Sequence, residues 1–209
     1  MKKTMAVLCA LLLICFAVTA SADLYRPETP ELLRTLIGGK TFTAAVTGLE
    51  STGEDEDTTF TVSVTVCERD RFDAAVIDKL AAGDILVFGN GTGAMITEAA
   101  ADEFGVTAAD GEGSVYSFSK TEDGSYIVST DGDFPFYTEI FTVKVSLPKD
   151  IRFLDWSDPE NHDGPVELGF DELLDHLLEG TDFAPYNTQV TFDENGKLVE
   201  FLYNYSPWN

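Results

Sequence analysis

The stretch from Asp155 to Gly164 concentrates side chains that bind hard metal ions. It reads Asp-Trp-Ser-Asp-Pro-Glu-Asn-His-Asp-Gly, a composition typical of a loop. Calcium takes about six to eight oxygen ligands, so carboxylates gathered in one loop indicate a calcium site. The four ligands predicted for it are Asp155, Asp158, Glu160 and Asp163. The alternative is a solvated acidic surface, because the spacing departs from that of an EF-hand and a chain with 37 acidic residues forms such clusters by chance.

A glycine-rich stretch from Gly89 to Ala94 fits the G-x-G-x-x-A pattern of dinucleotide-binding loops. It follows the apolar segment 85–88, and Asp110 lies near the distance expected of an acid that binds ribose. That chemistry needs a parallel strand-helix-strand unit, and only a weak strand pattern follows. Asn90-Gly91 is also a preferred turn between two antiparallel strands. The sequence therefore favours a hairpin that joins 85–88 to 94–97 over a nucleotide site.

One cysteine and two histidines are the minimum for a thiol nucleophile. Cys67 ends an alternating strand pattern beside Glu68, whose charge disfavours the thiolate. His176 is expected on the polar face of a helix, and nothing in the sequence brings it or His162 to Cys67. Glycoside hydrolysis by a pair of carboxylates stays an open alternative. The distance between the two carboxyl groups decides that chemistry, and the sequence does not give this distance.

Residue patterns predict the elements that would hold these side chains. Segments 41–49, 59–68, 85–88, 115–118, 126–128, 137–145, 188–192 and 197–205 read as strands. Apolar and hydroxyl side chains alternate in 59–68, so one face of that strand should be buried. Helical spacing predicts helices over 29–37 with Thr29 as N-cap, over 70–83 with Asp70 as N-cap, and over 169–179 with Gly180 just past its end.

Antiparallel hairpins predominate in this pattern, and the three helices fall before or between them. It predicts an α+β fold with a mostly antiparallel, partly closed β-sheet and about three short amphipathic helices. The chain is long enough for a substantial core, and it contains no internal repeat or low-complexity linker. Residues 23–209 are expected to form a single domain.

The first 22 residues have the pattern of a secretory signal peptide. Lys2 and Lys3 precede an apolar run, and Ala20-Ser21-Ala22 fits an A-x-A cleavage site. The run is shorter than the roughly 20 residues that a membrane-spanning helix needs. We therefore expect cleavage between Ala22 and Asp23 and a mature protein that is secreted or held at the cell surface, with no stable membrane span. Cys67 would then be its one cysteine, without an intramolecular disulfide.

The charge balance narrows the choice of partners. The chain has 13 Lys and Arg against 37 Asp and Glu, a formal net charge of −24. This charge disfavours nucleic acid, because affinity for phosphate backbones depends on clustered Lys and Arg. A strongly negative field instead favours cationic peptides or multivalent cations.

Two short segments carry a resemblance to other proteins. The final hairpin, from Phe192 through Asp193-Glu194-Asn195-Gly196 to Tyr205-Ser206-Pro207-Trp208, resembles the ending of secreted proteins of Gram-positive gut anaerobes. Leu80-Ala81-Ala82-Gly83-Asp84-Ile85 is similar to a helix-to-strand turn in small β-rich modules of such proteins. The resemblance implies an exported bacterial protein, and it carries no known activity and no functional residues.

These features favour a non-enzymatic exported domain that binds a small molecule, a glycan or a protein at or outside the bacterial cell surface. The alternative is a hydrolase that acts on glycans with two carboxylates, with or without calcium. An enzyme should place at least two acids of the 155–163 loop in a concave pocket, with one carboxyl desolvated. A binding domain should leave that loop exposed. No catalytic residue is predicted, and calcium is the one cofactor considered.

Overall fold

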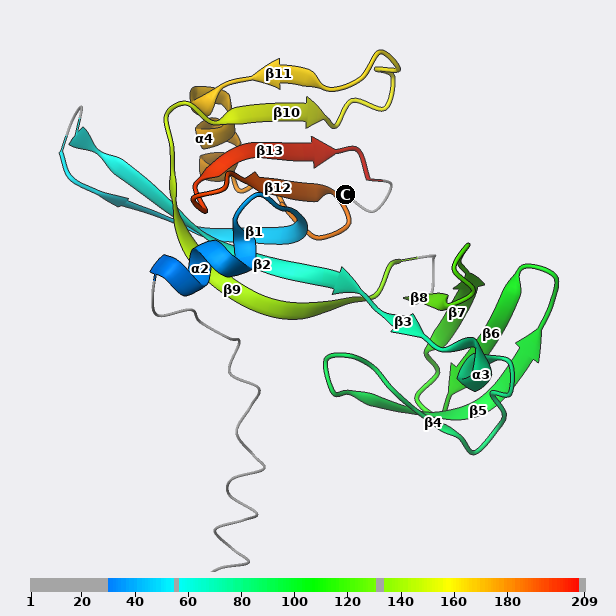
Figure 1. The fold of residues 1–209 in the computed structure, drawn as a ribbon. Coiled ribbons are helices and arrows are strands. Elements are labelled where there is room, and N and C mark those ends of the chain that lie inside the picture. Colours follow the sequence, from blue (N-terminus) through cyan, green and yellow to red (C-terminus); the bar gives the residue numbers. More distant parts are fainter. Residues whose placement is uncertain (1–29, 55–56, 131–133, 207–209) are drawn as a thin grey trace, which may run out of the picture.

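A computed structural model gives the fold of residues 30–54, 57–130 and 134–206. These residues form thirteen strands and three short helices, and the strands build two curled sheets that lie side by side (Figure 1). The predicted signal peptide, residues 1–22, and the predicted N-cap Thr29 lie outside the described residues.

The elements follow one another along the chain with short connections. They are α2 (Pro30–Ile37), β1 (Thr41–Thr52), β2 (Thr59–Arg69), β3 (Arg71–Phe72), α3 (Ala74–Ile77), β4 (Ile85–Val87), β5 (Gly93–Ala101), β6 (Gly105–Asp110), β7 (Val115–Lys120), β8 (Tyr126–Thr130), β9 (Tyr137–Leu147), β10 (Arg152–Trp156), β11 (Val166–Leu168), α4 (Phe170–Glu179), β12 (Thr188–Phe192) and β13 (Leu198–Asn204).

The larger sheet has seven strands in the order β11-β10-β13-β12-β1-β2-β9. Its neighbours pair antiparallel except for β10 and β13, which run parallel. The alternation predicted for β2 is observed, since Val62, Val64 and Val66 are buried between half-exposed hydroxyl residues. Helix α4 packs on this sheet through Leu173, and α2 contributes Ile37 to the same core. Burial of these apolar side chains is the main stabilising contribution to the larger sheet.

The smaller sheet is an insertion between β2 and β9, which are hydrogen-bonded neighbours in the larger sheet. Its six strands lie in the order β3-β8-β7-β6-β5-β4, and all of its strand pairs are antiparallel. It has its own buried cluster, which includes Phe88, Tyr116 and Phe118. No residue of that cluster belongs to the core of the larger sheet.

The helix predicted over 70–83 is wrong in length and in its cap. The helical part is the single turn α3, and its N-cap is Asp73, whose carboxylate accepts the N–H of Ala75 at 2.7 Å. Residues 71–72 pair instead with β8 as the edge strand β3. Although the local sequence has helical spacing, these residues pair with a strand more than fifty residues away. The tertiary contact thus outweighs the local helix propensity.

Two further differences concern the acidic stretch at 155–164. Asp155 and Trp156 are the last residues of β10, so the loop begins at Ser157 rather than at Asp155. Strands β10 and β11 were not predicted at all, because β10 is short and β11 has three residues. β6 also lacks a predicted counterpart, whereas α4 and the hairpins β1–β2, β4–β5, β7–β8 and β12–β13 confirm the predicted pattern within a few residues at each end.

The fold class is confirmed in its coarser form: a mostly antiparallel β structure with three short helices among the described residues. Strand content is higher than the term α+β conveys. The assignment of residues 23–209 to one domain stays a prediction. Each of the two sheets has its own buried apolar cluster. Within the described residues, no helix has the length and apolar character to span a membrane.

Candidate functional site

The acidic loop does not converge on a shared centre. The carboxylate of Asp155 accepts the N–H of Ser157 at 2.9 Å, and that of Asp158 accepts the N–H of Glu160 at the same distance. The side chains of Glu160 and Asp163 are exposed. These hydrogen bonds fold the loop locally, as Asp commonly does in turns.

Asn161 organises the rest of this loop. Its side-chain N–H donates to the carbonyl of Gly164 at 2.8 Å, and its own carbonyl accepts the indole N–H of Trp156 at 3.0 Å. Among the described residues, no group of three or more His, Cys, Asp or Glu side chains is arranged to hold a metal ion. The calcium site at the four predicted ligands therefore stays a prediction, which a calcium titration reversed by EDTA would test.

The glycine-rich stretch is a hairpin connection, as predicted. β4 and β5 pair antiparallel, with Leu86 opposite Ala94, and the N–H of Phe88 donates to the carbonyl of Thr92 at 2.9 Å. Gly91 has a φ of 82°, a conformation that suits glycine. Residues 93–101 are a strand, so no helix N-terminus stands where a pyrophosphate would bind.

Cys67 is buried in β2, and its Sγ lies 3.4 Å from the carbonyl oxygen of Thr65. Burial raises the pKa of this thiol to about 11, and the nearby charge of Glu139 adds to the effect. A thiol with such a pKa is protonated at neutral pH and is a poor nucleophile. His162 is exposed in the acidic loop.

His176 does not lie on a polar surface, which corrects the prediction for α4. Its ring is half-buried, with its centroid 5.3 Å from that of Phe153 and 6.0 Å from that of Tyr203. Its Nδ1 lies 3.1 Å from the hydroxyl of Thr181. The helical spacing was correct, but the ring of His176 packs against Phe153 of β10 and Tyr203 of β13, beside the core of the larger sheet.

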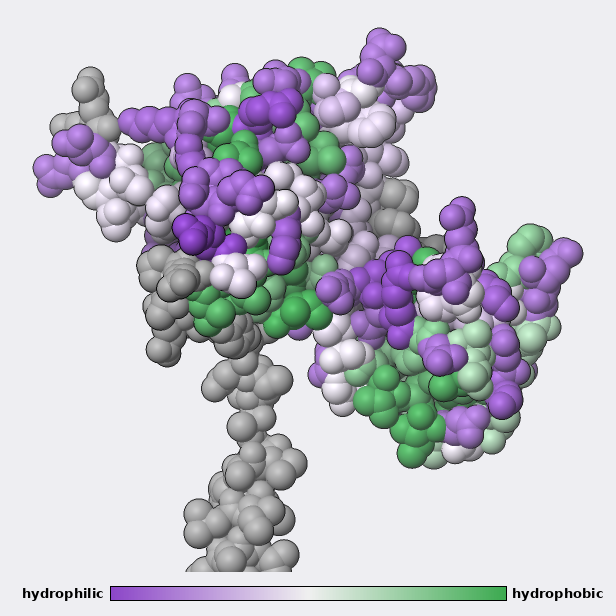
Figure 2. Space-filling view, viewed as in Figure 1, coloured by the Kyte–Doolittle hydropathy of each residue, from purple (hydrophilic) through white to green (hydrophobic). Residues whose placement is uncertain are grey.

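A large pocket of the described part of the chain lies where the two sheets meet, and we call it the junction groove. Its volume is about 1160 Å³. The side chains and backbone that line it come from both sheets: Thr41, Phe42, Thr43, Val66, Cys67, Glu68, Arg69, Asp70, Arg71, Phe72, Asp73, Val87, Gly89, Tyr137, Thr138 and Ile140. Figure 2 shows hydrophilic side chains gathered on the smaller sheet where it faces the larger one.

Asp70 fixes the geometry of this groove. Its buried carboxylate accepts the N–H of Gly89 at 2.8 Å and the hydroxyl of Thr138, and its own N–H donates to Phe136 at 3.1 Å. One residue in the β2–β3 connection therefore holds the end of β4 and the start of β9 together. Buried carboxylates of this kind are stable only when they are hydrogen-bonded.

The two arginines of the groove are engaged with neighbours. Arg71 forms an ion pair with Asp123 at 2.9 Å, and Arg69 donates from Nη2 to the hydroxyl of Ser129 at 3.1 Å. The charge of Arg71 is thus paired with a carboxylate, whereas the partner of Arg69 is a neutral hydroxyl and its Nε is buried without a hydrogen-bond partner among the described residues. Glu68 and Asp73 line the same groove with exposed carboxylates.

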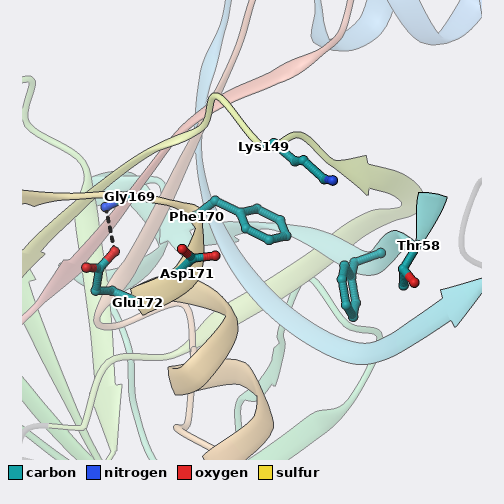
Figure 3. A pocket seen from close by; sticks show the side chains of 7 residues that line it. Thr58, Lys149, Gly169, Phe170, Asp171 and Glu172 are labelled. Atoms are coloured by element: carbon teal, nitrogen blue, oxygen red, sulfur yellow. Dashed lines mark hydrogen bonds between the residues drawn. The ribbon is translucent and has the colours of Figure 1, made fainter. Parts of the chain in front are cut away.

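A second pocket, of about 520 Å³, lies at the N-terminus of α4 (Figure 3). The rings of Phe60 and Phe170 line it with centroids 5.9 Å apart, and Lys149 lines the same pocket. Glu172 closes the helix end by accepting the N–H of Gly169 at 3.0 Å. Its carboxylate therefore serves the cap of α4.

The sequence did not point to the junction groove. The sequence predicts the end of a strand and the start of a helix over its charged run from Glu68 to Arg71. Tyr137 and Thr138 lie almost seventy residues later in the chain, and only the insertion between β2 and β9 brings them to this run. The alternation of acid and base in Glu68-Arg69-Asp70-Arg71 directly after an apolar strand was the one local signal.

Comparisons of this chain with protein-family models, with curated proteins and with solved structures found no significant match. The class that the fold and the groove define is therefore a two-sheet, mostly antiparallel β-protein, and function is argued from its surface alone.

Proposed function

We propose that this protein is an exported, non-enzymatic binding domain that holds an extended, positively charged segment of a partner protein in the junction groove. The observation that carries the proposal is the groove itself. It is concave and combines apolar side chains with charged groups on elements from two sheets, which is the composition typical of binding sites.

Strand β9 supplies the second argument. It is the last strand of the larger sheet, so among the described strands nothing pairs with its outer edge. Ile140 interrupts the register between β2 and β9, and its side chain is exposed in the groove. An edge strand beside a groove is a common site for an added peptide strand, whose backbone supplies affinity while side-chain contacts supply specificity.

Charge selects the kind of segment. The formal net charge of −24 gives the protein a negative field, and of the two arginines in the groove Arg71 is already paired with a carboxylate. A basic segment is therefore steered toward the protein, and an acidic one is repelled. The interaction should weaken as salt is added, because exposed charges are screened over roughly 10 Å at 0.1 M salt.

The test uses the chain from Asp23 onward and a fluorescein-labelled peptide of alternating Lys and Val, read by fluorescence anisotropy. We expect it to bind more tightly than a Glu-Val peptide of equal length. Ile140→Ser should weaken binding about fivefold, because apolar contact in the groove is lost. Ile85→Ser is the matched control, since Ile85 is an exposed strand residue that does not line the groove, and it should leave affinity unchanged.

Equal affinity for the two peptides, or equal loss in the two variants, would refute the proposal. Export itself is tested separately by mass spectrometry of the native protein, which should begin at Asp23. The hydrolase alternative gains no support from the 155–163 loop, because none of its acids lines any of the three pockets described.

A further inference from the structure

A third pocket, of about 540 Å³, lies within the smaller sheet. Phe88, Tyr116 and Phe136 contribute aromatic rings to its lining, and Met95 contributes an exposed thioether side chain. The centroid of Phe88 lies 5.2 Å from that of Tyr116 and 4.6 Å from that of Phe136. Phe88 and Tyr116 are buried in the core of the smaller sheet, so the partly exposed ring of this cluster is that of Phe136.

Two carboxylates stand beside these rings. Asp110 and Glu112 both line the pocket, and none of the described residues that line it is a Lys or an Arg. Desolvation by itself would raise the pKa of Asp110, but hydrogen bonds to its carboxylate outweigh this effect and lower the pKa. The carboxylate is therefore charged at neutral pH. The pocket thus pairs the half-buried ring of Phe136 with fixed negative charge.

The hydrogen bonds of Asp110 decide which cation fits. One oxygen accepts the N–H groups of Glu112 and Ser114, both at 2.9 Å, and the other accepts the hydroxyl of Tyr116 at 2.9 Å. Protein donors therefore use much of the hydrogen-bonding capacity of the carboxylate, while its charge remains. Such a carboxylate favours a cation that needs no hydrogen-bond acceptor over a primary ammonium. A primary ammonium must replace its lost hydration with hydrogen bonds to acceptors.

We propose that this pocket binds a quaternary ammonium group, with the half-buried Phe136 ring as its aromatic contact and the Asp110 carboxylate as its counter-charge. Aromatic faces attract such cations electrostatically, and methylated nitrogen also gains from contact with apolar surface. The site is separate from the junction groove, because the two pockets share no lining residue. It therefore stands whether or not the groove binds a basic segment.

The ligand test is calorimetric titration of the chain from Asp23 onward with choline. The matched control is 3,3-dimethyl-1-butanol, the neutral isostere in which carbon replaces the quaternary nitrogen. Choline should bind about tenfold more tightly, because only the cation interacts with the Phe136 ring and the carboxylate. Equal binding of the two compounds, or no binding of choline, would overturn the proposal.

Variants separate this site from a general effect of net charge. Phe136→Leu keeps an apolar side chain but removes a ring, and it should reduce choline affinity about fivefold. Phe104→Leu is its control, because Phe104 is highly exposed and does not line the pocket. Glu112→Gln should weaken choline binding, whereas Ile140→Ser in the junction groove should leave it unchanged. A Phe136→Leu chain that folds, by circular dichroism, and binds choline normally would contradict the proposal.

Free cations and lipid headgroups share this chemistry, so a second arm distinguishes them. The protein is sedimented with vesicles of phosphatidylcholine, and with phosphatidylglycerol vesicles as the control. Choline binding together with sedimentation on phosphatidylcholine alone supports a lipid headgroup as the source. Choline binding without sedimentation supports a soluble cation.

Discussion

Asp70 shows how one residue can join two sheets. It was predicted to cap a helix, but its carboxylate is buried and bonds to Gly89 of the smaller sheet and to Thr138 of the larger one. Gly89 is suited to this contact, because a Cβ there would lie 2.5 Å from the Thr138 hydroxyl oxygen. The groove that we propose as the binding surface depends on this contact.

Asp70→Ala should lower the free energy of unfolding by about 2 kcal/mol, since the N–H of Gly89 and the hydroxyl of Thr138 both lose the buried carboxylate that accepts from them. Urea denaturation at pH 7 measures this change. Asp84→Ala is the matched control, because Asp84 is exposed and accepts a single N–H, that of Ala81, at 2.9 Å. If both variants lose the same stability, the role assigned to Asp70 is wrong.

Cys67 gives a second prediction at the level of one residue. Its thiol has a pKa of about 11, against an ordinary value of 9.0, because of burial. A thiol-specific reagent should label the native chain from Asp23 onward slowly at pH 8 and rapidly in urea. Val87→Cys places a thiol on an exposed strand residue and should label rapidly without urea. Rapid labelling of native Cys67 would contradict the assignment.

The raised pKa of Cys67 makes the free energy of unfolding depend on pH. Because the pKa of the folded state is raised, the neutral thiol is favoured by folding, and its contribution is fully present below pH 9. That contribution is lost as the pH rises from about 9 toward 11. Cys67→Ser should remove this part of the pH dependence in urea denaturation.

At the level of elements, hairpins with glycine at the turns or at points of close approach build the smaller sheet. β6 and β7 pair with Gly105 opposite Ser119. A Cβ at Gly105 would lie 1.9 Å from the carbonyl oxygen of Phe118, so no side chain fits without a backbone shift. A glycine inside a strand pattern often marks such a close approach.

Gly105→Ala should therefore destabilise the protein by about 3 kcal/mol, as overpacking against a backbone atom does. Gly111→Ala is the control: the nearest atom to its Cβ would be the Thr97 methyl at 3.7 Å, an ordinary contact. Chemical denaturation followed by far-UV circular dichroism compares them. Similar midpoints for the two variants would show that the β6–β7 pairing tolerates a side chain at Gly105.

At the level of the whole molecule, the main feature is the division of the apolar interior. Phe118 is buried in the smaller sheet and Phe201 in the larger one, and the two clusters share no residue. The chain leaves the larger sheet after β2 and returns to it at β9, so the smaller sheet is held by two connections (Figure 1). Separate cores allow separate local unfolding.

Phe118→Ala and Phe201→Ala form a matched pair that tests this division. Each should cost about 3 to 5 kcal/mol of packing in its own cluster. Hydrogen exchange should show that Phe118→Ala lowers amide protection in β6, β7 and β8 while β12 and β13 stay protected. Phe201→Ala should lower protection in β12 and β13. Uniform loss of protection in both variants would indicate one cooperative unit.

Elements that form through contacts between neighbouring residues were predicted from the sequence, and elements that depend on contacts with distant residues were not. β2, the β12–β13 hairpin and α4 were predicted because their alternation, turns and end signals lie within a few neighbouring residues. The helix expected over 70–83 failed because Arg71 and Phe72 pair with Ile127 and Tyr126. His176 was misplaced because its environment is made by strands outside its own helix.

The sequence by itself determined the strand-rich character, most hairpins, the strongly negative charge and the expectation of export, since each depends on local pattern or on composition. Only the tertiary structure decided that the strands divide between two sheets, that Asp70 joins them, and that three aromatic rings and Asp110 share a pocket. Those features depend on contacts between residues far apart in the chain. Such contacts are selected by the burial of whole surfaces, which no short segment encodes.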